Sequence, residues 1–362
     1  MPDTDRPLRV GVVGCGSFGR AAYALNVADS PDACVAALCD TDQSRAEAVA
    51  GEIEDRDQSP AIHTDYQQMI DRESLDIVMV ATMADLRPRI TIQALRAGAH
   101  VLAAKPMAPS LPEAEEMLRT AEAVDRTFMV GYNFRFREDS QAIHRFIQDS
   151  GLGTPLFARA WSHTAGIPTW GPHYIKSQSA GGALASTAVH PLDLAVWVLG
   201  CPPLLSVEGH AGARFADLPD LPPDLEAVRP AYDTEDLVTG YARFENGVTL
   251  SLEGMWLTPS QIGNIGVDVW GSHGYASLVP FRLFTWQNGD YVDRTEEIAP
   301  GLAAAYRDEV GDRRRVETFH FIDCVLGRTA PLVTPKEMWT DQAIVDGIYA
   351  GRCSFDPNSA PG

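Results

Sequence analysis

The stretch of residues 8–40 constrains the fold of this chain more than any other. An apolar run ends in Gly14, Gly16 and Gly19, spaced as G-x-G-x-x-G, and a second apolar run ends at Asp40. In such a pattern the first glycine permits a tight turn, and the second lets a pyrophosphate approach the backbone. The third lets a helix pack closely on its strand. The stretch therefore predicts a strand, turn, helix, strand unit that binds a dinucleotide.

The residues around this turn also predict which dinucleotide binds. A helix beginning near Ser17 and Phe18 would direct its free N–H groups and the positive end of its dipole at the pyrophosphate. Asp40 can accept hydrogen bonds from the ribose hydroxyls, and its charge repels the extra phosphate of NADP. Arg45, the nearby cation, belongs to the next helical pattern. We therefore expect NAD rather than NADP.

The first part of the chain alternates strand and helix patterns. Further apolar runs that read as strands occupy residues 61–63, 76–81, 100–103 and 128–131. Helical patterns separate them, and Gly98 follows one of these at a C-cap position. The alternation predicts an N-terminal α/β domain, residues 1–131, built as a Rossmann doubly wound parallel sheet of about six strands. Its ligand should lie at the carboxyl ends of the strands.

The pattern changes after residue 132. Strands are expected at residues 155–161, 205–213, 236–244, 248–255 and 266–270. This predicts a C-terminal α+β domain, residues 132–362, with a mainly antiparallel open sheet and helices on one face. The last helices could pack back on the N-terminal domain. Residues 215–232, rich in Pro and Asp, are expected to form a surface insertion without fixed structure of its own.

Charge and composition exclude several classes of protein. The formal net charge of −20 argues against nucleic acid or an anionic membrane as a partner, because both need a basic surface. Residues 1–9 contain no apolar run, so no signal peptide is expected, and no stretch is apolar enough to span a membrane. We therefore expect a cytoplasmic protein. The six cysteines lack a C-x-x-C pair and are expected to be free thiols.

Lysine is scarce, which draws attention to Lys105. The chain has only Lys105, Lys176 and Lys336. Lys105 follows the strand at 100–103, and Pro106 keeps it out of helical geometry. A cation on this turn could stabilise a developing alkoxide. We predict a catalytic role for Lys105 and cofactor contacts for Thr82, Lys105 and Pro106, which all follow strands of the predicted sheet.

A second candidate group lies in an apolar helical pattern of the C-terminal domain. Ser186, His190 and Asp193 are spaced i, i+4 and i+7, so they would share one helical face. His190 can accept a proton near neutral pH and is predicted to be the catalytic base. His163, His173 and His190 lack the spacing of metal ligands, so no metal is expected.

Further polar residues could contact a substrate. They follow the last strand of the predicted Rossmann sheet or lie in the loop before the helix of His190, which also holds Trp170. Aromatic faces and polar tips suit a polyhydroxylated ligand. The predicted substrate contacts are Asn133, Arg135, His163, Lys176, Ser186, His190 and Asp193.

Four segments together carry a resemblance to a known family. They are the glycine turn, residues 97–106 ending in Ala-Ala-Lys-Pro, residues 131–136 with the sequence Gly-Tyr-Asn-Phe-Arg-Phe, and residues 181–193. Over nearly its whole length the chain resembles the Gfo/Idh/MocA oxidoreductases. The resemblance implies NAD(P)-dependent oxidation or reduction of a sugar, cyclitol or related carbinol, with Lys105 and His190 as catalytic groups. It also implies a homodimer or homotetramer.

The chain departs from the family pattern at three positions. The family commonly has Glu before the Lys-Pro pair, Asp four residues before the histidine and Gly two before it, where this chain has Ala104, Ser186 and Ala188. Three interpretations stay open: a dehydrogenase that needs only Lys105 and His190, a regulatory protein that binds dinucleotide or sugar without turnover, and a redox-neutral lyase or glycosidase that uses transient oxidation. We favour the first, because both candidate catalytic groups remain.

Overall fold

The computed structural model describes residues 6–169, 171–221, 223–259, 262–302 and 312–361, so Trp170 and most of the N-terminal segment 1–9 lie outside the described residues. The chain forms two compact units. Unit 1 comprises Met1–Ala108, Pro112–Asn133 and Val310–Pro335, and unit 2 comprises Pro109–Leu111, Phe134–Glu309 and Lys336–Gly362. The domain limits expected from the sequence, 1–131 and 132–362, stay a prediction.

Unit 1 is built on a six-stranded parallel sheet, which confirms the predicted doubly wound fold. The strand order is β3-β2-β1-β4-β5-β6. Every residue of β4 is buried, as expected for a central strand that is covered on both faces. The strands are β1 (Leu8–Val13), β2 (Ala33–Cys39), β3 (Ala61–His63), β4 (Ile77–Val80), β5 (His100–Ala103) and β6 (Phe128–Val130).

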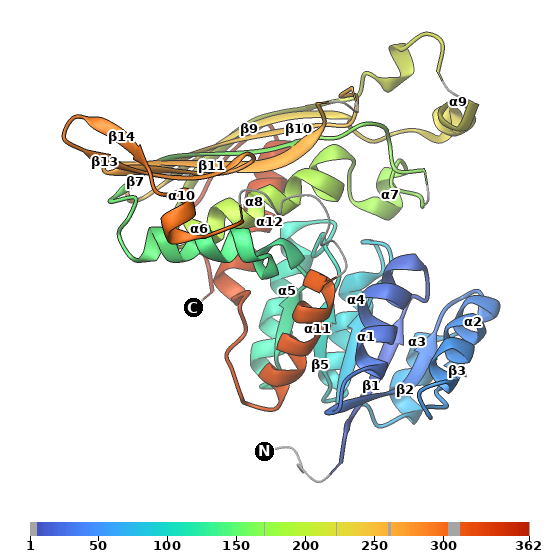
Figure 1. Ribbon diagram of the computed structural model, residues 1–362. Coiled ribbons are helices and arrows are strands. Elements are labelled where there is room, and N and C mark those ends of the chain that lie inside the picture. The colour runs from blue at the N-terminus through green and yellow to red at the C-terminus, as the bar shows by residue number, and fades with distance from the viewer. Residues whose placement is uncertain (1–5, 170, 222, 260–261, 303–311, 362) are drawn as a thin grey trace. The chain divides into compact units, whose positions relative to one another are not determined.

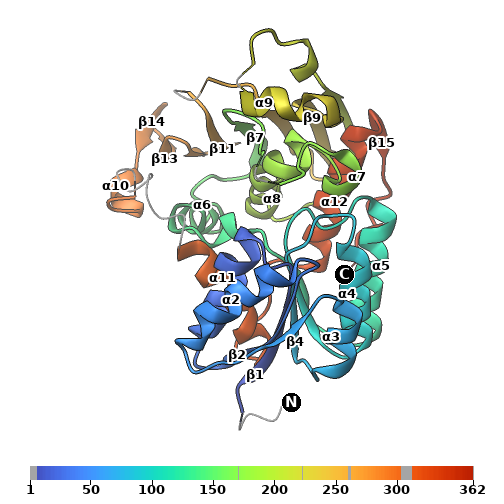
Figure 2. The same cartoon turned by 90° about the vertical axis from the view of Figure 1, so that its right-hand side faces the viewer.

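Helices cover both faces of this sheet (Figure 2). One face carries α1 (Leu25–Ala28), α2 (Gln43–Glu54) and α11 (Asp312–Val325), and the other carries α3 (Tyr66–Arg72), α4 (Arg87–Arg96) and α5 (Leu111–Ala123). Asp42 and Asp65 start α2 and α3 by accepting backbone N–H groups, as N-caps do. Helix α11 is far along the chain from η1 (Gly19–Ala24), the helical segment before α1, yet Thr318 donates its hydroxyl to the carbonyl of Ala22.

Unit 2 contains a nine-stranded sheet of order β14-β13-β12-β11-β7-β10-β9-β8-β15. Only β7 and β10 pair in parallel, so the prediction of a mainly antiparallel sheet is confirmed. The strands after residue 271 were not predicted. The nine strands are β7 (Pro155–His163), β8 (Leu204–Gly212), β9 (Leu237–Phe244), β10 (Thr249–Met255), β11 (Asn264–Gly271), β12 (Gly274–Leu278), β13 (Phe281–Gln287), β14 (Asp290–Asp293) and β15 (Arg352–Ser354).

Long helices cover one face of this sheet (Figure 1). They are α6 (Glu138–Gln148), α8 (Val189–Val198) and α12 (Pro335–Tyr349), and shorter helices are α7 (Lys176–Ser179) and α10 (Thr295–Ile298). Helix α12 approaches the sheet closely, because a Cβ at Gly209 or Gly240 would meet the side chain of Ile348 within 2.9 or 2.5 Å. Within the described part of the chain, no helix has both the length and the apolar character that crossing a membrane requires.

The expectation that residues 215–232 have no fixed structure is wrong. The segment forms η4 (Phe215–Asp217), α9 (Pro223–Val228) and η5 (Arg229–Ala231). Phe215 and Trp256 are both fully buried in a shared apolar cluster. Asp236 accepts the backbone N–H groups of Arg214 and Phe215, which ties the start of the segment to β9. Apolar residues among the Pro and Asp residues therefore bury enough surface to order the segment.

Candidate active site

The glycine turn of unit 1 leaves room for a ligand at one position only. Gly14 has a φ of +95°, and a Cβ there would lie 2.8 Å from the carbonyl of Ala81. A Cβ at Gly19 would collide with the carbonyl oxygen of Gly14, whereas nothing lies within 4 Å of a Cβ at Gly16. Gly14 and Gly19 therefore allow the tight turn and the close helix, and Gly16 leaves space in front of the backbone. This geometry fits a pyrophosphate.

The helix after this turn begins at Ser17 and is π-helical over Gly19–Ala24. Ser17 is exposed, as a residue that contacts a ligand must be. The ring of Phe18 packs edge-on against Tyr23, and the guanidinium of Arg314 lies 5.2 Å from the centre of the Phe18 ring. The start of the helix therefore contacts α11 through Arg314.

Asp40 stands at the end of β2, where the sequence places the ribose contact. Its carboxylate accepts the backbone N–H groups of Cys15, at 2.8 Å, and Asp42, at 3.0 Å, which fixes its orientation beside the glycine turn. Arg45 pairs with Asp42 at 3.3 Å. The cation that could have offset a 2′-phosphate is thus already next to a carboxylate.

Arg87 joins the two turns that hold Thr82 and Lys105. It donates to the carbonyl of Thr82 at 2.6 Å and to the carbonyl of Pro106. The side chain is only 5% exposed, and burial lowers the pKa of Arg87 to about 10. The sequence did not predict this role of Arg87, because no motif marks a residue that bonds two carbonyls.

Lys105 lies on the turn directly after β5, at the carboxyl edge of the sheet. Its side chain is partly buried. Burial lowers the pKa of Lys105 to about 7, and the nearby cations Arg87 and Arg314 lower it further in the same direction. An amine with such a pKa can donate or accept a proton near neutral pH.

Asn133 follows β6 at the same edge of the sheet. Its side chain is 3% exposed, and its Oδ1 is buried with no hydrogen-bond partner among the residues that the structure describes. Buried acceptors are nearly always bonded in native proteins. The orphaned oxygen of Asn133 therefore fits a ligand that donates a hydrogen bond at this edge.

In unit 2, His190 lies in the first turn of α8. The carboxylate of Glu235 accepts the backbone N–H groups of Gly182 and Leu184, both at 2.9 Å, and so caps the helical segment that leads into α8. The imidazole of His190 stacks on the ring of Phe134, with the ring centres 4.6 Å apart and the planes 16° apart. Phe134 thus fixes the orientation of the predicted base.

Ser186, predicted to share a helical face with His190, is 6% exposed and lies in a π-helical turn, Leu184–Ala188. Its hydroxyl is 3.4 Å from Nδ1 of His173. The structure therefore brings Ser186 to a histidine from the preceding loop. Helical periodicity could not show this contact, because His173 lies in a loop outside the helix.

Arg135 and Asp193, both predicted to contact substrate, are bonded to each other. The guanidinium meets the carboxylate at 2.5 Å, and Glu337 accepts a second hydrogen bond from Arg135 at 2.8 Å. Neither Arg135 nor Asp193 has any exposed surface. In this structure their charged groups therefore bond to each other and to Glu337 inside unit 2.

The other two predicted contacts, His163 and Lys176, lie next to other side chains. His163 is 3.4 Å from Glu253, which pairs with Arg159, so these groups occupy the sheet face opposite the buried Ser162. Lys176 is exposed, and its ammonium lies 5.4 Å from the centre of the Tyr349 ring. Within the described ranges, no group of His, Cys, Asp and Glu is placed to hold a metal ion.

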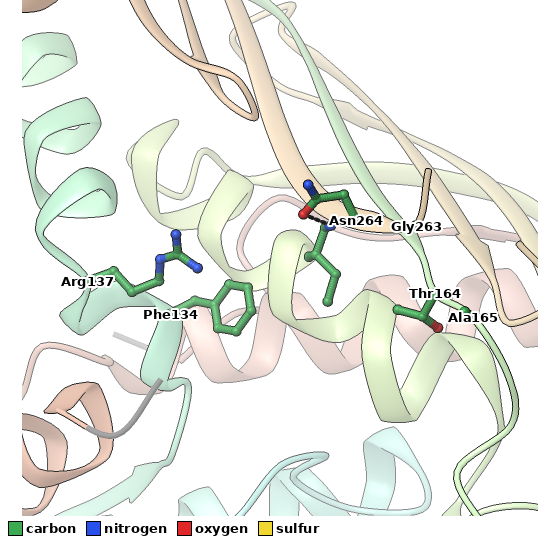
Figure 3. Close-up of a pocket in the computed structure, with 7 residues that line it drawn as sticks. Phe134, Arg137, Thr164, Ala165, Gly263 and Asn264 are labelled. Carbon is green, nitrogen blue, oxygen red and sulfur yellow. Dashed lines mark hydrogen bonds between the residues drawn. The ribbon is translucent and has the colours of Figure 1, made fainter. Parts of the chain in front are cut away.

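A pocket of about 300 Å³ opens in unit 2 beside Phe134 (Figure 3). Arg137 and Phe134 lie on one side of it, and Thr164 and Asn264 lie on the other. The pocket is lined by Phe134, Arg137, Thr164, Ala165, Gly263, Asn264 and Ile265. Sequence reasoning missed this set. Phe134 is part of the quoted segment 131–136, but nothing in the sequence marks Asn264 at the start of β11.

Among the described residues that line the pocket, Arg137 alone is charged. Its guanidinium is 5.4 Å from the centre of the Phe134 ring. Because His190 stacks on the same ring, Phe134 connects the pocket to the predicted base. A ligand in the pocket would therefore lie near His190.

Comparison with known proteins agrees with this architecture. Residues 8–132 match the family model described as an oxidoreductase family with an NAD-binding Rossmann fold, and residues 140–277 match the GFO/IDH/MocA C-terminal domain.

Relatives of known activity share nearly the full length. The D-glucoside 3-dehydrogenase of Escherichia coli (strain K12) is 27% identical over 349 residues, which cover 96% of this chain and 95% of the relative. The inositol 2-dehydrogenase 2 of Saccharopolyspora erythraea is 27% identical over 310 residues, 84% of this chain and 83% of the relative. An oxidoreductase domain protein from Kribbella flavida has the same fold, with a TM-score of 0.82 at 19% identity and coverage of 97% and 99%. The chain therefore belongs to the Gfo/Idh/MocA family of NAD-binding oxidoreductases.

Proposed function

We propose that this protein uses NAD to oxidise a secondary hydroxyl of a sugar or cyclitol to a carbonyl, and that Lys105 and His190 act on the reacting oxygen. The observation that carries the proposal is Lys105, a partly buried amine with a pKa of about 7 at the carboxyl edge of an NAD-binding sheet. The related D-glucoside 3-dehydrogenase and inositol 2-dehydrogenase 2 support a polyhydroxylated substrate.

The residues of unit 1 would hold the cofactor as follows. The pyrophosphate would lie against Gly16 and the helix N-terminus at Ser17, and Asp40 would accept hydrogen bonds from the ribose. The carboxylate of Asp40 favours NAD over NADP. When bound, NAD accepts a hydride from the carbinol carbon. The buried Oδ1 of Asn133, which follows β6 at this edge of the sheet, would accept a hydrogen bond from the cofactor or substrate.

His190 and Lys105 have different roles at the substrate oxygen. His190 takes the hydroxyl proton as the carbon loses its hydride, and the proton then passes to water. Lys105, in its ammonium form, donates a hydrogen bond to the oxygen and stabilises the negative charge that develops there. Lys105 belongs to unit 1 and His190 to unit 2, so their action on one oxygen atom is part of the proposal.

The test is to incubate the protein with NAD and a panel of cyclitols, aldoses and methyl glycosides and to follow NADH absorbance. NADH that forms together with a ketone product, identified by mass, supports the proposal. Conversion of a glycoside without net NADH would instead support the redox-neutral alternative. Binding of NAD without any product would support a regulatory role.

A further inference from the structure

The charges around the pocket of unit 2 suggest which sugars enter it. In the part of the lining that the structure describes, Arg137 alone is charged, and it already pairs with a carboxylate. Its Nε donates to one carboxylate oxygen of Asp139 at 2.9 Å, and its Nη2 donates to the other at 2.5 Å. This is the two-pronged geometry in which arginine binds a carboxylate most strongly.

The pair is also held in place. Asp139 lies in the first turn of α6 and accepts the backbone N–H of Ser140 at 2.7 Å. The exposed fractions of the Arg137 and Asp139 side chains are 19% and 10%, so water screens the pair only weakly. The carboxylate of Asp139 is therefore held in a fixed position beside the guanidinium of Arg137.

We infer that the pocket takes an uncharged ring of monosaccharide size and discriminates against sugar acids and sugar phosphates. Because the carboxylate of Asp139 already offsets the charge of Arg137, an anionic group in the pocket would lose its hydration without gaining the full attraction of a cation, which costs free energy. The inference rests on the proposed function, because it names the substrate class of that reaction.

The rest of the lining suits the same ligand. The volume of about 300 Å³ lies at the small end of ligand pockets, which favours one ring over a larger conjugate. The hydroxyl of Thr164 and the side-chain amide of Asn264 are neutral groups that hydrogen-bond sugar hydroxyls. Phe134 adds an apolar edge for the C–H groups of the ring.

The experiment compares matched substrate pairs on the full chain with saturating NAD. The pairs are methyl β-glucoside with methyl β-glucuronide, and glucose with glucose 6-phosphate. We expect kcat/KM for the neutral member to exceed that for the anion by a factor on the order of 100. In Asp139→Asn, which keeps the size of the side chain and removes its charge, the anion should gain at least about tenfold relative to the neutral sugar. Glu297→Gln, which alters an exposed pair with Arg294, is the matched control and should leave the ratio unchanged.

The possible results separate this inference from the proposed function. Equal or better turnover of the anions by the wild type would overturn the inference and leave the proposed function standing, as would an unchanged ratio in folded Asp139→Asn. If no compound yields NADH, the proposed function fails, and the melting temperature with each compound decides the inference. The inference is supported if the neutral sugar raises the melting temperature at a lower concentration than its anionic partner does. It is overturned if the anion acts at the lower concentration.

Discussion

Arg135 and Asp193 meet at 2.5 Å in an ion pair from which solvent is fully excluded. We expect Asp193→Asn to lower the free energy of unfolding by about 3–5 kcal/mol, because it leaves a buried guanidinium short of a charged partner. Glu208→Gln is the control, since Glu208 and Arg352 form an exposed pair at 3.0 Å, and it should cost less than about 1 kcal/mol. Urea unfolding measures both. Equal losses of unfolding free energy in the two variants would show that groups other than Asp193 stabilise the Arg135 guanidinium.

Asp341 lies near Asp193, but its negative charge should lower the stability of the folded protein, whereas the charge of Asp193 should raise it. Burial and the neighbouring Asp193 raise the pKa of Asp341 well above its usual value. The folded protein therefore binds a proton that the unfolded chain releases above about pH 4. Wild-type stability should fall relative to Asp341→Asn as the pH rises from about 4 to 7, because asparagine cannot lose that proton. Urea unfolding at several pH values tests the sign, and a relative gain for the wild type would contradict it.

Lys105→Met should lower turnover by a factor on the order of 100 or more, because the oxygen loses its stabilising cation. The affinity for NAD should change only a few-fold, as measured by fluorescence titration. Lys336→Met removes a lysine from the start of α12 and is the control that should keep full turnover. Equal turnover of wild type and Lys105→Met would remove Lys105 from the mechanism.

The pH dependence should separate the roles of the two groups. The base His190 must be neutral, so kcat/KM for oxidation should rise with pH through its titration, and His190→Asn should lack this acidic limb. Lys105 must be charged, and its pKa of about 7 predicts a fall in rate above neutrality that Lys105→Met lacks. Rates measured from about pH 5 to 9 test both limbs. An acidic limb that survives in His190→Asn would assign the base to another residue.

Cofactor choice should depend on the charge of Asp40. Asp40→Asn keeps an acceptor for the N–H of Cys15 and removes the repulsion of a 2′-phosphate, so the preference for NAD over NADP should weaken at least about tenfold. Asp32→Asn alters a carboxylate just before β2, the strand that Asp40 follows, and should leave the preference unchanged. Dissociation constants for both cofactors provide the measurement. Similar affinities in the wild type would refute the role of Asp40.

The candidate residues of unit 1 could be found from the sequence, because their signals are local. Gly14, Gly16 and Gly19 act through the backbone conformation of their own turn, and Asp40 acts from the end of the next strand. Each signal therefore lies within one strand, turn, helix, strand unit. The parallel strand order then places Lys105 at the same edge of the sheet.

The C-terminal half could be predicted less well, since its side chains are placed by distant partners. Asp193 is turned inward by Arg135, and the π-turn before α8 alters the face that Ser186 presents. The position of His163 could have been read from strand alternation, because Ala158 and Ala160 point into the core. The pocket combines a loop, the end of β7 and the start of β11, which no single motif joins.

The two candidate sites differ in how much sequence change they can absorb. At Gly19 even one added methyl group would run into the backbone of Gly14, so the dinucleotide turn tolerates almost no variation. Thr164 and Asn264 instead lie where strands end and begin, and exchanging their side chains would leave the ladders of the sheet intact. Substitutions at this pocket can therefore accumulate in small steps without disturbing the dinucleotide turn.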